Sequence, residues 1–334
     1  MSLKRFLITS TISIIITATI AVAGCAIYAS NLYQQSGPLS QDTLFEIKKG
    51  SGVSSIATQL EQQNIISHAL LFKAAAQITG DHVNIKAGEY KIVAHSSMKD
   101  VLEQIVSGDI YLRMITIPEG LTSWQIVERL NKIDDLEGII TDIPAEGSLL
   151  PETYSYSSSD TKADIIAHMK KAMNKATHEL WETRAENLPI KTKEEAIILA
   201  SIIEKETSVP AERQNVSGVF INRLNKGIAL QTDPTVIYAI TKGKIQDKGK
   251  GPLGRRLLKK DLKTDSPYNT YMYPGLPPGP IANPGKASIH AALNPAKHEY
   301  FYFVADGTGG HAFGKTLAEH NSNVAKWRKI RNKQ

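Results

Sequence analysis

Two glutamates at the end of an apolar stretch, Glu204 and Glu206, have the residue type and the setting of a general acid. On a helical wheel with Ile198 at zero, the apolar side chains at 198–203 cover roughly 140°, and Glu206 falls inside that arc near ~80°. Glu204 falls at about 240°, close to Ile197 at about 260°. Because burial disfavours the charged carboxylate and raises its pKa toward neutrality, Glu206 is the first candidate and Glu204 the second.

A helix must position these carboxyl groups. Thr192 is placed to act as its N-cap, with the hydroxyl accepting from the N–H of Glu195 and the Glu195 carboxylate reaching back to Thr192, as in a capping box. Pro210 limits the helix at its other end. The alternative is a helix that frays near Glu206 and leaves both glutamates in solvent.

A second carboxylate would be needed if the reaction were hydrolysis of a glycoside. Asp233 or Glu204 could supply it. Asp233 lies in a polar turn, 230–236, that also holds Gln231, and the following Pro234 predicts an extended backbone at Asp233. The sequence has no HExxH, GxSxG, P-loop or strand-linked GxGxxG pattern, so we expect no metal and no cofactor.

A stiff aromatic segment, 266–284, contains six prolines and three tyrosines, including Tyr271 two residues after Asn269. Its prolines exclude a helix or a central strand, and its rings suit either a sugar-binding wall or ordinary packing. His311 follows the glycine turn 306–310 and could contact a substrate or serve only the structure.

The N-terminus carries Lys4 and Arg5 before an uncharged stretch of 23 residues, 6–28, long enough to cross a hydrocarbon layer of about 30 Å. The positive-inside rule places the rest of the chain outside the cytoplasm. Cys25, the single cysteine, ends a lipobox-like Val-Ala-Gly-Cys, so a lipid anchor is the alternative to a spanning helix. Because Cys25 is the single cysteine, the chain cannot form an intramolecular disulfide.

A net charge of +6 from 39 basic and 33 acidic residues is too weak and too evenly spread for a nucleic-acid-binding protein. It is compatible with anionic cell-wall polymers or lipid headgroups, and equally with a soluble basic protein.

The chain is predicted to be α+β. We expect a membrane segment at 1–30, a linker at 31–43, a small LysM-like α+β region at 44–140 and a larger mixed α+β catalytic domain at 141–334. Segments 47–60 and 117–130 repeat one pattern, a strand end, a glycine turn and a short helix, with Ser54 and Thr122 as the expected N-caps. The first copy is similar to the opening of a LysM module, a β-α-α-β unit that binds glycans.

Seven motifs occur in order along the second half of the chain: EKET, FINRL, LQTDPTVIYAI, SPYNTY, GLPPGPIANPG, YFVADGTGGHAF and AEHN. With them the chain resembles the endolytic murein transglycosylase family, MltG or YceG-like, over essentially its whole length. The resemblance implies a membrane enzyme that cuts the β-1,4 bond between N-acetylmuramic acid and N-acetylglucosamine in nascent peptidoglycan and leaves 1,6-anhydro ends. One acid–base carboxyl group suffices for that reaction, because the C6 hydroxyl of the substrate replaces water.

The family's catalytic glutamate corresponds to the second glutamate of EKET, Glu206. The resemblance also implies substrate contacts by Glu204, Gln231, Asp233, Asn269, Tyr271 and His311, and partners among cell-wall synthases such as penicillin-binding proteins. It implies a single-pass protein of the bacterial cytoplasmic membrane with its catalytic part on the outer side. Two alternatives stay open: a hydrolytic muramidase that uses a second carboxylate, and a glycan-binding scaffold without activity.

Overall fold

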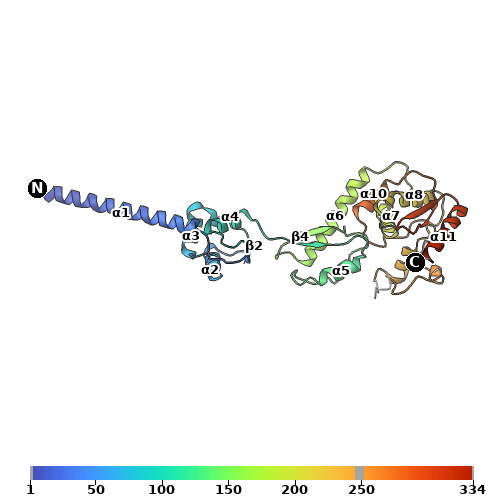
Figure 1. The fold of residues 1–334 in the computed structure, drawn as a ribbon, viewed down its shortest axis with the longest axis horizontal. Helices are drawn as coiled ribbons and strands as arrows, with labels where there is room; N and C mark the ends of the chain where they lie inside the picture. Colours follow the sequence, from blue (N-terminus) through green and yellow to red (C-terminus); the bar gives the residue numbers. More distant parts are fainter. Residues whose placement is uncertain (1–2, 245–251, 333–334) are drawn as a thin grey trace. The chain divides into compact units, whose positions relative to one another are not determined.

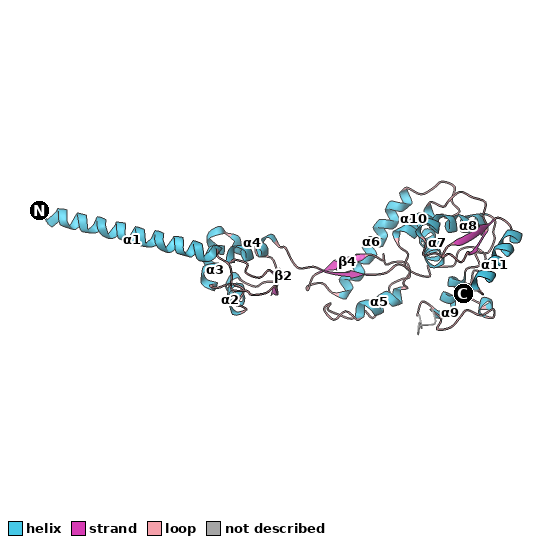
Figure 2. Cartoon of the chain, viewed as in Figure 1, coloured by secondary structure: helices cyan, strands magenta, loops and turns pink. Residues whose placement is uncertain are grey.

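The computed structural model describes residues 3–244 and 252–332. The fold is mixed α+β, as predicted, and the described strands form three two-stranded sheets, β1–β2, β3–β4 and β5–β6 (Figures 1 and 2). The chain divides into two compact units, 1–113 with 155–159 and 114–154 with 160–334. This division lies elsewhere than the expected boundary at residue 140.

The first unit begins with one long helix, α1, Leu3–Gln34. Within Ser10–Gln34 an 18-residue window has a mean hydropathy of 2.2, and α1 is the one helix of the described residues long and apolar enough to cross a membrane. The expected linker at 31–43 is partly helical, since α1 continues to Gln34. The N–H of Gly37 then donates to the carbonyl of His95 (3.1 Å), which ties the chain to this unit at once.

The body of the first unit follows the order β-α-α-β, with a short 3₁₀ helix before the second strand and one further α-helix after it. Strands β1 and β2 are antiparallel, with Phe45 opposite Tyr90, and both side chains are buried in the core of this unit. The element order is the predicted one, and the likeness to a glycan-binding LysM module stays a prediction. The elements are β1 Thr43–Ile47, α2 Val53–Gln62, α3 Ala69–Thr79, η1 Asp81–Val83, β2 Gly88–Ile92 and α4 Met98–Ser107.

The repeated strand, turn and helix pattern is confirmed in both copies. Gly50 and Gly120 make the two turns with φ of +85° and +75°, which only glycine adopts without strain. Thr122 caps α5 (Ser123–Asn131) in a capping box with Gln125. The prediction for Ser54 was wrong: α2 begins at Val53, and its N-cap is Gly52, which has no side chain to offer.

The second unit is built around α7, Lys193–Glu206, whose residues 196–203 are all buried. Helix α10 packs along α7, and α6, α8 and α9 also contact it. Strand β3, Arg113–Thr116, leads into this unit. Strand β4 is Thr153–Tyr156. The further elements of the second unit are α6 Lys162–Glu182, η2 Pro210–Glu212, α8 Arg213–Asn225, α9 Asp233–Thr241, η3 Asp261–Lys263, α10 Lys286–Leu293, β5 Tyr302–Ala305, β6 His311–Gly314 and α11 Leu317–Arg331.

The start of α7 is close to the prediction but not identical. The Thr192 hydroxyl accepts from the N–H of Glu195 (3.1 Å), as expected of an N-cap. The Glu195 carboxylate does not complete a capping box, because it accepts the N–H of Lys191 instead. That bond still satisfies a backbone donor ahead of the first turn.

Candidate active site

Glu206 is the last residue of α7, so its carboxyl group stands where the buried helix reaches a cavity. The next residue, Thr207, already has an extended backbone (φ −139°, ψ 132°). The predicted alternative of a helix frayed before Glu206 is therefore wrong. The cavity measures about 530 Å³, and it is lined by Glu206, Phe220, Arg223, Leu230, Gln231, Thr232, Asp233, Tyr271, Tyr302, Phe303, Val304, Ala305, His311, Leu317 and His320.

The pKa of Glu206 is raised, first of all by burial and further by the negative charge of Asp233. Three groups act in the opposite direction and lower this pKa: the side chain of Thr232 and the positive charges of His311 and Arg223. The net effect is a raised pKa, which is the direction that a general acid needs.

Asp233 lies in the first turn of α9 and shares the cavity with Glu206. The extended conformation predicted at Asp233 was wrong, because Pro234 sits at the start of a helix, where the missing N–H has no intrahelical acceptor to lose. The Tyr271 hydroxyl donates to Asp233 Oδ1 (2.7 Å). Burial and this contact raise the pKa of Tyr271, so the phenol stays protonated as a donor.

Gln231 and Asn269 hold the two loops that carry Asp233 and Tyr271. Gln231 has a φ of +52°, a left-handed backbone uncommon for a residue other than glycine, and its N–H donates to the carbonyl of Thr270 (3.0 Å). Asn269 is fully buried, and its Oδ1 accepts the N–H of Tyr271 (3.0 Å). Gln231 lines the cavity, whereas Asn269 supports the loop from behind.

His311 enters the cavity from β6 and is held by Glu212, which ends η2. One Glu212 oxygen accepts the backbone N–H of His311 (2.8 Å), and the other lies 2.7 Å from Nδ1 of the same residue. Because a carboxylate only accepts, this contact places a proton on Nδ1 and leaves Nε2 for a ligand. The ring packs edge-on against Phe303, with centroids 5.3 Å apart.

Arg223 is a cavity residue that the sequence reading passed over. Its Nε donates to the carbonyl of Phe301 (2.7 Å) and its guanidinium to that of Leu230 (2.8 Å), so it joins the two segments that flank the cavity. Its guanidinium lies over the Tyr302 ring, 5.3 Å from the centroid. The sequence feature that could have indicated its role is an arginine on the apolar face of a helix, because a buried guanidinium needs several hydrogen-bond acceptors.

Glu204 is not among the residues that line this cavity. Its side chain is only 6% exposed, lies 3.5 Å from the Arg213 guanidinium and accepts the N–H of Gly285 (3.0 Å). Arg213 also pairs with Glu119 (3.3 Å), whose pKa is raised by burial and by the charge of Glu204. The wheel ranked Glu204 second and left its burial open, and the structure buries it because α7 is covered on that side too.

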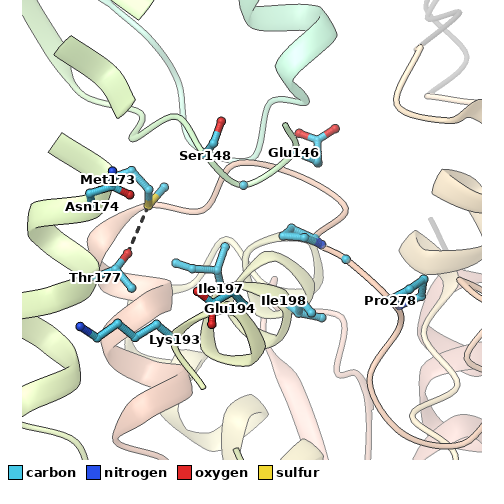
Figure 3. A pocket seen from close by; sticks show the side chains of 13 residues that line it. Glu146, Ser148, Met173, Asn174, Thr177, Lys193, Glu194, Ile197, Ile198 and Pro278 are labelled. Carbon is cyan, nitrogen blue, oxygen red and sulfur yellow. Dashed lines mark hydrogen bonds between the residues drawn. The ribbon is translucent and has the colours of Figure 1, made fainter. Parts of the chain in front are cut away.

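A second cavity of the same unit lies between α6, α7 and two loops, and it measures about 380 Å³ (Figure 3). Glu146, at its edge, accepts from the Ser123 N–H (2.8 Å) and the Asn283 amide (3.0 Å), and burial raises its pKa. None of the predicted site residues lines this cavity. Across 3–244 and 252–332, no group of three or more His, Cys, Asp or Glu could hold a metal ion.

Comparison with known proteins gives matches along most of the chain. The YceG-like family matches residues 45–326. An endolytic murein transglycosylase of Bacillus subtilis (strain 168) is 34% identical over 348 aligned residues, which cover 94% of this chain and 92% of the relative. An endolytic murein transglycosylase of Streptococcus pneumoniae serotype 2 (strain D39) is 31% identical over 84% of this chain and 57% of its own length.

A solved structure gives a similar result. The 2.6 Å crystal structure of a YceG-like protein from Listeria monocytogenes has 33% sequence identity and a TM-score of 0.50, and the match covers 85% of this chain and 99% of that one. The family match extends over well more than half of the sequence, and the chain therefore belongs to the YceG-like family.

Proposed function

We propose that this chain is a lytic transglycosylase that cleaves the bond between N-acetylmuramic acid and N-acetylglucosamine in peptidoglycan, with Glu206 as its acid–base residue. The observation that carries the proposal is a carboxyl group with a raised pKa at the end of a buried helix, facing a cavity of about 530 Å³. The names of the B. subtilis and S. pneumoniae relatives support the same reaction class.

The proposed reaction needs one carboxyl group in two successive roles. Glu206 first donates its proton to the leaving O4 as the bond from C1 to O4 breaks. As a carboxylate, it then accepts the proton of the C6 hydroxyl while O6 forms a bond to C1. The glutamate ends protonated again, no water is consumed, and the muramic acid ends as a 1,6-anhydro sugar.

The other predicted residues divide into two proposed roles. Gln231, Asp233, Tyr271 and His311 line the cavity and would contact the sugar, with Asp233 close enough to influence the charge on Glu206. A negative charge beside the anomeric carbon would stabilise the positive charge that develops there. Glu204 and Asn269 would act only through the backbone segments that they hold.

The hydrolytic alternative keeps a specific observation in its favour, namely that Asp233 shares the cavity with Glu206. A hydrolase would use Asp233 as nucleophile or base and would release reducing ends. The hydrogen bond from Tyr271 weakens that alternative, since it withdraws electron density from Asp233 Oδ1.

The membrane helix, the topology and the partners are also proposals. The apolar segment of α1 supports a single-pass anchor in the cytoplasmic membrane, with both units outside. An acylated Cys25 is the alternative anchor. We propose cell-wall synthases, such as penicillin-binding proteins, as partners, because a cut within nascent strands requires the enzyme to reach glycan as it is made.

The test is product analysis by mass spectrometry. Purified peptidoglycan is treated with the full-length chain in detergent, with its Glu206→Gln variant and with Glu128→Gln, a matched change at an exposed position on α5. We expect anhydro-ended fragments from the parent and from Glu128→Gln, and at least about a hundredfold fewer from Glu206→Gln. Reducing ends from the parent would favour the muramidase, and equal products from all three proteins would remove Glu206 from the chemistry.

A further inference from the structure

Helix α3 of the first unit exposes an apolar face. The side chains of Leu70 and Ile78 are 83% and 85% exposed, although the other side of the same helix buries Phe72 and Ala76 in the core. Leu70, Ala74 and Ile78 recur every four residues and therefore form one continuous stripe. A contiguous exposed apolar stripe of this kind is typical of a surface that meets a partner or a membrane.

The neighbouring 3₁₀ helix η1 carries a further exposed apolar side chain. It packs against α3 and presents Val83, which is 74% exposed. Lys73, half-buried, lies beside the stripe on α3. The stripe formed by Leu70, Ala74 and Ile78, together with Val83, is called the α3 face below.

The first unit is fastened directly to the end of α1. Leu32 and Tyr33 of α1 pack against the core of the unit, and α1 contacts both α3 and α4. The chain leaving α1 passes so close to Ser96 that a Cβ at Gly37 would lie 2.2 Å from its carbonyl oxygen. The body of the first unit is therefore held close to the end of α1.

The length of α1 places this unit at the membrane surface. The segment that could cross the membrane, Ser10–Gln34, has 25 residues and is about 37 Å long, and its last turn holds Leu32 and Tyr33. The headgroup region adds about 5–7 Å to each side of the hydrocarbon layer. The body of the unit, which packs against Leu32 and Tyr33, thus begins within the headgroup region. Figure 1 shows α3 at the end of the unit that α1 enters.

We propose that the α3 face rests in the interfacial region of the outer leaflet of the membrane that α1 crosses. The inference depends on the proposed anchoring by α1. Apolar side chains on one face of a helix enter the boundary between headgroups and acyl chains, and the Lys73 ammonium can reach lipid phosphates from the flank. Acylation at Cys25 would preserve the arrangement, because Cys25 lies only about 12 Å before Tyr33 along the helix.

Depth-dependent fluorescence quenching tests the proposal on the full-length chain. In a Cys25→Ser background, Ile78→Cys is labelled with an environment-sensitive dye, and the protein is reconstituted in vesicles of phosphatidylethanolamine and phosphatidylglycerol. Lys49→Cys, exposed in the turn at the far end of β1 from the α1 junction, is the matched control, and Ile16→Cys in α1 reports insertion of the helix. The quenchers are doxyl lipids in the bilayer and iodide in the water.

The expected result is quenching of the dye at position 78 by doxyl lipids of about twofold or more, with iodide effective only at position 49. Leu70→Cys should behave like position 78. If iodide quenches the dye at position 78 while doxyl lipids quench it at position 16, the proposed membrane contact of the α3 face is overturned and the anchoring by α1 still holds. Protection of position 78 from both quenchers would mean that protein covers it, and would also overturn the proposal. Loss of lipid quenching at position 16 would reject the anchor and this inference together.

Discussion

Replacing each of the two EKET glutamates by glutamine should separate a chemical role from a structural one. Glu206→Gln removes the proton donor of the proposed reaction and leaves the shape of the cavity unchanged. General acid–base catalysis contributes about 10²–10⁴ in rate, so the variant should lose about 3–5 kcal/mol of transition-state stabilisation. Its stability should not fall, because a neutral amide replaces a carboxyl group whose ionisation burial already opposes.

Glu204→Gln should show the reverse pattern. The amide can still accept the N–H of Gly285 through its carbonyl oxygen, but it cannot form the ion pair with Arg213, which keeps its contact with Glu119. The side chain is 6% exposed, and a hydrogen bond to a charged group in such a place contributes about 1.5–3 kcal/mol. We therefore expect the free energy of unfolding to fall by about 2 kcal/mol, with the rate of the folded enzyme changed less than about tenfold.

Two measurements on the same preparations decide the question: the initial rate of release of anhydro-ended fragments, and urea unfolding followed by circular dichroism. A Glu204→Gln variant that is stable but inactive, beside an active Glu206→Gln, would refute the assignment of roles. Loss of activity in both variants without loss of stability would show that the ion pair with Arg213 serves catalysis.

Three further outcomes follow from the contacts around the cavity. Activity should fall with rising pH along a limb above the ordinary glutamate pKa, since the acid form of Glu206 is lost there; a limb set by a tyrosine or lysine would contradict this. Asp233→Asn removes the negative charge that raises the Glu206 pKa, so a pH–rate profile should show that limb at lower pH, whatever the height of the maximum. Glu212→Gln should raise KM or lower kcat, because the carboxylate that positions the His311 ring is lost. The signal of the Nδ1 proton of His311 should move in nitrogen-resolved NMR, and an unchanged imidazole spectrum would exclude a positioning role for Glu212.

Local rules predicted some features correctly and others, such as the N-cap at Ser54, wrongly, and the sequence was insufficient where burial depends on distant segments. Thr122 was predicted as an N-cap from its place before an apolar helix, and it is one. The helical wheel placed Glu206 on the apolar side of α7, but it contains no information about other segments. Arg213 and Gly285, which lie 9 and 81 residues further along the chain, cover the side of α7 that carries Glu204. Burial of Glu204 follows from this tertiary packing and not from helical periodicity.

The contacts within the cavity could not be predicted from the sequence either, because they join segments that are far apart along the chain. Tyr271 and Asp233 belong to separate motifs, and only the fold brings the phenol to within 2.7 Å of the carboxylate. Arg223 was passed over because FINRL reads as an ordinary helix, and its three carbonyl acceptors come from loops whose positions no sequence pattern specifies. The family motifs located these residues, whereas their hydrogen-bond partners required the structure.

The contact between Tyr271 and Asp233 bears on why the proposed product is an anhydro sugar. A carboxylate that accepts a hydrogen bond from a phenol is a weaker base and nucleophile than a free one, and burial together with this contact raises the pKa of Tyr271 so that the donor persists. Asp233 is then suited to stabilise positive charge at the anomeric carbon but poorly suited to activate water. Attack by the C6 hydroxyl, which is already part of the substrate, meets no such obstacle.

Tyr271→Phe tests this argument, because it removes the hydroxyl and keeps the aromatic ring. If Asp233 only stabilises charge, the reaction of the variant should be slower by about tenfold, because one hydrogen bond is lost. The products should still carry anhydro ends alone. Tyr273→Phe is the matched control, since its hydroxyl donates to Asp265 outside the lining of the cavity. Reducing ends that appear with Tyr271→Phe and disappear with the added Asp233→Asn change would show that Asp233 can activate water once it is released. The phenol would then determine the product, and Asp233 would be more than a stabilising charge.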